Sequence, residues 1–262
     1  MNIPFEPHIF GFTINIHMVM EYLAFFIGYR YYKFIRKNSS DSISSKNRLS
    51  IILGAIIGGY IGSRFVGFLE NPDILINVKS IVHILNAKTI MGGLFGGLLG
   101  VEIAKRKIKE THSSGDLFTF PIIIGIFIGR IGCFLSGTNE FTYGSQTTFF
   151  TGMNLGDGIL RHPLALYELV FLAVLFIILR LIQFKNIHLE NGLIFKYFMI
   201  SYFGFRFLIE FLKPNVFFIG SLSSIQWVCI VCWLYYLKTL IKLFLYANKK
   251  IYILRLHYKS LP

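Results

Sequence analysis

The chain alternates between long apolar runs and short polar segments along its whole length. A helix needs about 20 mostly apolar residues to cross the hydrocarbon core of a bilayer. The runs here are continuous rather than alternating in polarity, so they predict helices and not the strands of a membrane barrel. We therefore predict seven spanning helices, over residues 13–35, 49–69, 89–104, 117–136, 163–183, 192–212 and 224–246.

The composition agrees with this pattern. Hydrophobic residues make up 54% of the 262 residues and charged residues only 15%, which is typical of a membrane protein. No polar stretch between the apolar runs is long enough to form a soluble domain. We therefore expect residues 1–262 to form a single all-α, polytopic membrane domain surrounded by the lipid bilayer.

The basic residues are distributed unevenly, although a net charge of +13 alone would also suit a nucleic-acid-binding protein. Lysines and arginines gather in residues 30–48, 105–109, 185 and 238–259, whereas the alternate connections hold few. Such residues are enriched on the cytoplasmic side of membrane proteins. The pattern predicts an N-terminus outside the cell and a C-terminus in the cytoplasm, and it argues against binding of nucleic acid.

Two of the apolar runs carry glycine at every fourth position. These glycines are Gly54, Gly58 and Gly62 in one run and Gly92, Gly96 and Gly100 in the next. Small residues at this spacing allow two helix backbones to approach closely, so we expect the two helices to pack together. A further expectation is that the backbone N–H groups of Gly92 and Gly93 face a lipid headgroup.

The three cysteines, Cys133, Cys229 and Cys232, all lie within apolar runs. We expect buried thiols there and no disulfide framework, because free cysteine behaves as a small apolar residue. Cys229 and Cys232 have the spacing of a redox or metal pair, but no histidine lies near them. The sequence therefore predicts neither a metal site nor a cofactor.

One arginine, Arg130, lies inside the fourth apolar run. An isolated guanidinium at the bilayer centre costs roughly 2.5–3.5 kcal/mol on insertion scales, so such residues usually face a polar cavity. Arg206 lies at a comparable depth in the sixth run, with Glu210 four residues later on the same helical face. Two guanidiniums at one site suit a phosphodiester, because each can donate two hydrogen bonds. The alternative is that each arginine only forms an Arg–Glu ion pair.

The stretch around Arg130 resembles the signature of the prolipoprotein diacylglyceryl transferases, Gly-Arg-x-Gly-Asn-Phe-x-Asn-Gly-Glu. The matching positions are Gly129, Arg130, Gly132, Phe134 and Gly137. Cys133 and Ser136 stand where the family has asparagine, and Glu140 lies two residues after the position of the family's glutamate. The polar segment that follows extends to Gly144.

Further matches to the family occur in the same order along the chain. The segment from His162 to Glu168 resembles its His-Pro-x-x-Leu-Tyr-Glu motif, with Tyr167 before the glutamate. Shorter matches are Arg64 after Gly62-Ser63, the pair Gly92-Gly93, and Arg206 with Glu210. The resemblance covers most of residues 54–215.

The resemblance implies an enzyme that transfers a diacylglyceryl group from phosphatidylglycerol to the lipobox cysteine thiol of a preprolipoprotein. It implies a location in the bacterial cytoplasmic (inner) membrane, and phosphatidylglycerol, the preprolipoprotein signal peptide and the lipid bilayer as partners. The catalytic residues that it implies are Arg130, Glu140, His162 and Arg206. The substrate-binding residues that it implies are Arg64, Gly92, Gly93, Gly137, Gly144, Tyr167, Glu168 and Glu210.

Met91 occupies the position of the family's third-span histidine, and methionine cannot accept a proton. His162 and Glu140 are the candidates to replace that histidine as a base. Two other functions stay open. One is a catalytically silent homologue that binds lipid or a partner protein. The other is an intramembrane serine protease, which would need Ser136 and His162 within hydrogen-bonding distance.

Overall fold

The computed structural model describes residues 3–9, 11–39, 41–70, 88–185, 190–215 and 219–245, and it is mostly helical. The helices are α1 (Ile16–Lys37), α2 (Ser45–Glu70), α4 (Ile90–Ile108), α5 (Asp116–Ser136), α6 (Leu164–Lys185), α7 (Leu193–Ile209) and α8 (Ser224–Tyr235), with the 3-10 turns η2 (Gly137–Asn139) and η3 (Glu210–Leu212). Two antiparallel hairpins are formed by β1 (His8–Ile9) with β2 (Phe12–Thr13) and by β3 (Met153–Asn154) with β4 (Leu160–Arg161).

The first six predicted helices agree with the observed bounds to within about one turn. Local sequence explains several of the ends. The side chain of Asn15 accepts the N–H of Met18 at the start of α1, and Thr89 accepts that of Gly92 at the start of α4, at 3.0 and 3.2 Å. Lysines and arginines occupy the last turns of α1 and α4, where the helix dipole is negative.

The last predicted helix, over residues 224–246, is bent rather than continuous. Helix α8 ends at Tyr235, and a second helical segment, Leu237–Leu245, follows at an angle of 70°. This second segment carries Lys238 and Lys242 one turn apart, and both side chains are exposed. Two ammonium groups on one helical face need polar surroundings, which gives a physical reason for the segment to leave the apolar bundle.

Within the described residues, three helices are long and apolar enough by length and composition to cross a membrane. They are α2, α5 together with η2, and α6; α8 with its bent continuation would be a fourth if the pair forms one span. Large apolar side chains point outward from the bundle, such as Phe25, Ile56 and Val170, which are 71%, 61% and 66% exposed. A continuous apolar exterior of this kind suits contact with lipid chains.

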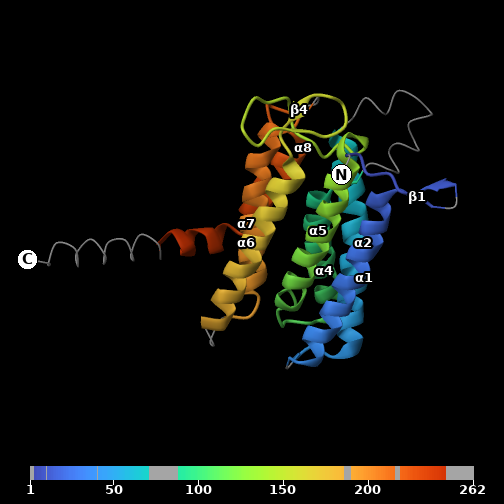
Figure 1. The fold of residues 1–262 in the computed structure, drawn as a ribbon. Helices are drawn as coiled ribbons and strands as arrows, with labels where there is room; N and C mark the ends of the chain where they lie inside the picture. The colour runs from blue at the N-terminus through green and yellow to red at the C-terminus, as the bar shows by residue number, and fades with distance from the viewer. Residues whose placement is uncertain are drawn as a thin grey trace, which may run out of the picture.

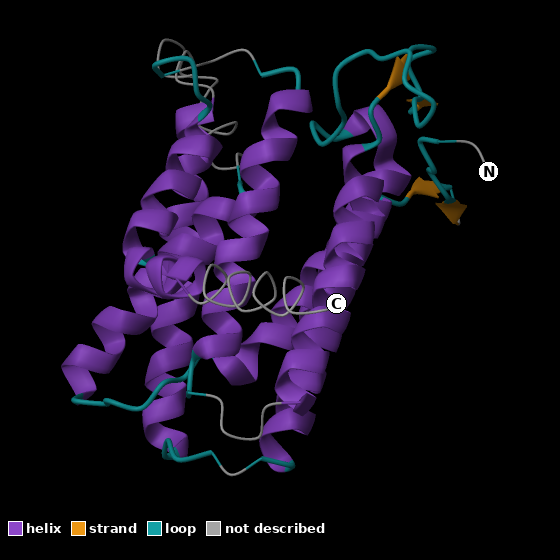
Figure 2. Ribbon diagram, turned by 90° about the vertical axis from the view of Figure 1, so that its left-hand side faces the viewer, coloured by secondary structure: helices purple, strands orange, loops and turns teal. Residues whose placement is uncertain are grey.

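Helix α5 is central, because it packs against α1, α6 and α7. In Figure 1 the helices stand side by side, and the hairpin of β3 and β4 lies at the upper end. The connections from α1 to α2 and from α4 to α5 lie at the opposite, lower end (Figures 1 and 2). The polar segment after α5 and the basic connections are therefore on opposite ends of the bundle.

The glycine-rich helices α2 and α4 pack with their backbones in contact, as the glycine spacing predicted. The facing pairs are Gly54 with Gly100, Gly58 with Gly96, and Gly62 with Gly92. A Cβ atom added at Gly58 would lie 2.3 Å from the carbonyl oxygen of Gly96. That distance is far below a van der Waals contact, so no side chain fits between these helices.

Replacing Gly58 with alanine is expected to force α2 and α4 apart and to lower the free energy of unfolding by about 1–3 kcal/mol, as other overpacked sites do. Gly129→Ala in α5 is the matched control, because a Cβ atom there meets nothing within 4 Å. The control is expected to be neutral or stabilising by up to about 1 kcal/mol, since alanine favours helix. Unfolding in detergent measures both variants, and equal stabilities would contradict the tight packing.

Candidate functional site

A cluster of four buried charges lies where α5, α6 and α7 meet. Arg130 comes from α5, Glu168 from α6, Arg206 from the last turn of α7 and Glu210 from η3. The Arg130 Nε atom lies 2.8 Å from Oε1 of Glu168, and the Arg206 Nη1 atom lies 2.8 Å from Oε2 of the same carboxylate. Both predicted arginines therefore meet at one point, and a carboxylate occupies the space between them.

The second acidic residue, Glu210, completes the cluster from η3, the turn that directly follows α7. Glu210 Oε2 accepts a hydrogen bond from Arg206 Nη2 at 3.3 Å, the pair that the four-residue spacing predicted. Tyr202, one further turn back on α7, donates its hydroxyl to Glu168 Oε1 at 2.6 Å. Tyr202, Arg206 and Glu210 recur every fourth residue, so α7 and η3 present one polar stripe to α6.

The ion pairs leave part of the cluster without hydrogen bonds. Arg130 Nε is close to Glu168, but its N–H is not aligned with the carboxylate. Among the described residues, the Nε–H groups of Arg130 and Arg206 and the Oε1 atom of Glu210 have no hydrogen-bond partner, although all three atoms are buried. Buried donors of this kind are costly, and natural sites that keep them usually have a role for them.

Burial makes the mutual pairing of these charges essential. Arg130 and Arg206 are each 7% exposed, and Glu168 and Glu210 are each 1% exposed. Taking an ion out of water costs several kcal/mol in proteins, and a nearby opposite charge offsets that cost. Two positive and two negative groups make the cluster formally neutral. Because the opposite charges come from different elements, each element depends on its neighbours for the counter-ions of its own buried charges.

Glu140 lies beside a histidine that the motif comparison did not single out. The Nδ1 atom of His17, in the first turn of α1, is 3.5 Å from Glu140 Oε1. On the other side of the site, Arg130 Nη1 donates to the Sγ atom of Cys133 at 3.6 Å. The Cys133 thiol and the imidazole of His17 are neighbours where α1 packs against α5.

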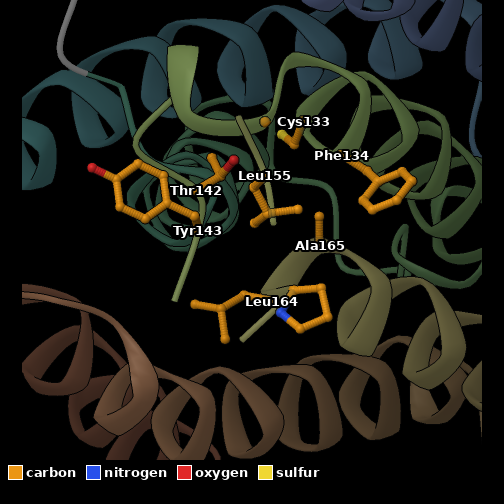
Figure 3. Close-up of a pocket in the computed structure, with 9 residues that line it drawn as sticks. Cys133, Phe134, Thr142, Tyr143, Leu155, Leu164 and Ala165 are labelled. Atoms are coloured by element: carbon orange, nitrogen blue, oxygen red, sulfur yellow. The ribbon is translucent and has the colours of Figure 1, made fainter. Parts of the chain in front are cut away.

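A narrow pocket opens beside these residues, between the end of α5 and the start of α6. Its walls include Cys133, Phe134, Tyr143, Leu155 and Leu164, which Figure 3 shows as sticks around the opening. The lining is mainly apolar, with the Cys133 thiol at one side. Its volume of about 10 Å³ has room for little more than one water-sized group.

The predicted catalytic residue His162 belongs to a different group of contacts. Its Nδ1 atom is 3.1 Å from the hydroxyl of Tyr167, and that hydroxyl also hydrogen-bonds to Thr151. Gly144 lies directly against His162, because its N–H donates to the His162 carbonyl at 2.9 Å. This group of residues forms the wall of the site beside the hairpin, and none of the hydrogen bonds described for it reaches Glu168.

The remaining predicted binding residues have mainly packing contacts. The N–H of Gly92 donates to the Thr89 side chain and that of Gly93 to the Thr89 carbonyl, at 3.2 and 3.0 Å. The expectation of free N–H groups facing a headgroup is therefore not met. Gly137 has a φ of 53°, and a Cβ atom added to it would lie only 2.2 Å from the Leu155 carbonyl oxygen. This position therefore requires glycine for its backbone conformation and for space. Arg64 places its guanidinium 5.4 Å from the centre of the Tyr60 ring.

Met91 is buried in the apolar core at 1% exposure, in the first turn of α4. The three cysteines are buried and unpaired, as predicted. In the part of the chain that the structure describes, no group of three or more His, Cys, Asp or Glu side chains could hold a metal ion.

Three residues that contact this region were not predicted. Tyr202 was detectable, because it lies four residues before Arg206 on the same helical face. His17 lies in the one span whose motif match is weak, so spacing alone gave no signal for it. Lys213 Nζ lies 3.0 Å from Glu70 and 3.8 Å from Glu210, and it follows the helix in a segment without a regular pattern.

Apolar helices around a cluster of paired arginines and glutamates define a multi-pass membrane protein with a buried ionic site. Residues 4–242 match the model of the family described as prolipoprotein diacylglyceryl transferase. The chain belongs to this family.

Individual relatives agree with the family match. The chain is 32% identical over 232 residues to a protein of Wolbachia sp. subsp. Brugia malayi, covering 83% of this chain and 85% of the relative. It is 34% identical over 241 residues to one of Rickettsia canadensis, covering 84% and 90%. It is 35% identical over 219 residues to one of Rickettsia akari, covering 78% and 81%. All three are named phosphatidylglycerol–prolipoprotein diacylglyceryl transferase.

Replacing Glu168 with glutamine would leave two buried guanidiniums with only Glu210 as a counter-ion. Breaking a buried ion pair from one side usually costs about 3–5 kcal/mol, and we expect a loss of that size in the free energy of unfolding. Glu102→Gln is the control, because Glu102 is 38% exposed and lies 3.7 Å from Lys105 in a surface pair. The control should lose less than about 1 kcal/mol. Unfolding in detergent compares them, and two similar losses would contradict a structural role for Glu168.

Proposed function

We propose that this protein transfers the diacylglyceryl group of phosphatidylglycerol to the lipobox cysteine thiol of a preprolipoprotein, in the cytoplasmic membrane of a bacterium. In this reaction a bond forms between the thiol sulfur and the glyceryl carbon. The bond between that carbon and the phosphate oxygen breaks, and glycerol phosphate leaves with the electron pair. The names of the relatives and the family match support this assignment.

The observation that carries the proposal is the pair of buried arginines that converge on one carboxylate. Arg130 and Arg206 both approach Glu168, and the buried Nε–H of Arg206 has no hydrogen-bond partner in the described structure. A phosphodiester has oxygens that accept such donors, and guanidinium suits phosphate better than ammonium does. Fixed donors in a water-poor site stabilise the charge that develops on the leaving phosphate.

Glu168 has two roles in this mechanism. It neutralises the guanidiniums when no lipid is bound, and it fixes their orientation through bonds from Arg206 and Tyr202. A donor that is already oriented needs no rearrangement at the moment of reaction, which is the main advantage of a preorganised site.

The serine protease and the silent homologue each have less support than the transferase. A serine protease needs Ser136 and His162 as a hydrogen-bonded pair. In the described part of the chain His162 instead bonds Tyr167, and no hydrogen bond joins it to Ser136. A silent lipid-binding homologue is favoured by one observation, the buried Met91 in place of the family histidine. A transfer assay separates that alternative from the enzyme.

The seven-span topology belongs to this proposal. It places the N-terminus and Asn154 outside the cell and Asn47 in the cytoplasm, because the basic connections lie together at the end that carries Asn47. Reporter fusions after Asn47 and after Asn154 should therefore give opposite signals. Equal signals from the two fusions would contradict the topology.

The second test concerns the two hydrogen bonds that each guanidinium can donate to a phosphate. Arg130→Lys and Arg206→Lys keep the charge but lose the two-bond geometry, and each is expected to slow transfer to a lipobox peptide by about 10²–10³-fold, as loss of one transition-state donor does. Arg106→Lys is the control, because Arg106 is exposed at the opposite end. Lipid-dependent modification of the peptide, followed by mass spectrometry, measures the rates. Wild-type rates in both variants would overturn the role of the arginines.

A further inference from the structure

The strongest unassigned cluster in the described structure is formed by His17, Glu140 and Cys133. We propose that His17, oriented by Glu140, accepts the proton of the substrate thiol, an assignment that rests on the transferase function proposed above. It would supply the base that Met91 cannot supply.

The approach of α1 to α5 places the histidine at the site. A Cβ atom at Gly132 would lie 3.3 Å from the Cα atom of His17 and 2.8 Å from the Cβ atom of Met20, so only glycine permits the contact. The imidazole then lies between Glu140, at 3.5 Å from its Nδ1 atom, and the Cys133 thiol. Cys133 in turn contacts the guanidinium of Arg130. A continuous path of contacts therefore joins Glu140 to the arginine cluster.

The exposure of the pair suits exchange of a proton with a substrate. The side chain of His17 is 16% exposed and that of Glu140 is 35% exposed, in contrast to the fully enclosed Glu168. A carboxylate 3.5 Å from Nδ1 favours the tautomer that carries its proton on that nitrogen, which leaves the lone pair of Nε2 to accept a proton. A base must come within hydrogen-bonding distance of the proton it removes, and a group at the mouth of the site meets this requirement.

The other groups around His17 agree with this role. Glu140 and Cys133 face the ring from the side of α5, and Glu21 lies one turn further along α1. Glu21 is held by Lys88 at 2.5 Å, so its charge is paired. His162 is engaged by Tyr167, and Met91 is enclosed in the apolar core, so neither competes for the same proton.

The step balances with the groups present. The thiol proton moves to Nε2 of His17, and the sulfur attacks the glyceryl carbon as its bond to the phosphate oxygen breaks. Glycerol phosphate keeps the electron pair of that bond and remains beside Arg130 and Arg206. The imidazolium then releases its proton to water or to the leaving phosphate, which restores the base.

The pH dependence of transfer tests the proposal. An imidazole base predicts a wild-type rate that rises with pH as the imidazolium loses its proton, and that reaches a plateau once the imidazole is neutral. His17→Gln should lower the rate at pH 7 by about 10²-fold and let it rise up to the thiol's own pKa of about 8.5. Glu140→Gln should reduce the rate less but also alter the profile. His112→Gln, at the exposed end far from the site, is the control and should keep the wild-type profile.

The shape of the profile separates a chemical role from a folding defect. A misfolded fraction lowers the rate equally at every pH, whereas loss of the base changes the shape of the curve. An unchanged profile in His17→Gln, or loss of the bend in His162→Gln instead, would overturn the assignment while leaving the transferase function intact. A wild-type protein that modifies no lipobox peptide would overturn both. Diacylglyceryl found on Cys133 itself would also contradict it, because that thiol would then be the acceptor.

Discussion

The carboxylate of Glu168 is the interaction on which the arrangement of the site depends. It lies between the guanidiniums of Arg130 and Arg206, so α5, α6 and α7 are joined at one buried point. In such surroundings a charge without a partner costs several kcal/mol, and this cost restricts the rotation of each helix about its axis. The apolar contacts around the cluster can vary in detail, but these polar contacts allow only one arrangement.

The neutrality of the cluster also sets the conditions for binding. A negatively charged headgroup that enters must share donors that Glu168 already uses, or accept the Nε–H of Arg206, which has no hydrogen-bond partner in the described structure. Lys213 adds a further positive charge near Glu210 and Glu70. Binding and stability therefore depend on the same few side chains, so a substitution in the cluster changes both together.

Much of the fold could be predicted from the sequence. Apolar runs of spanning length predict helices, and glycines at every fourth position predict that two of these helices pack closely. The Arg206–Glu210 pair followed from helical spacing, and the common depth of Arg130 and Arg206 followed from the order of the spans. That Glu168 would lie between them could not be derived, because spacing within a helix says nothing about which side chains of different helices meet. For the same reason His17 was missed, and the bend after Tyr235 depends on surroundings that composition does not describe.

The contact between α2 and α4 has a consequence for how this chain can diverge. The facing glycines leave no space for any side chain, and each partner's backbone occupies the position that a methyl group would need. A substitution at one glycine cannot be compensated by a smaller residue opposite, because glycine is already the smallest. These positions should therefore be among the slowest to change in related chains, even though none of them contacts the buried charges.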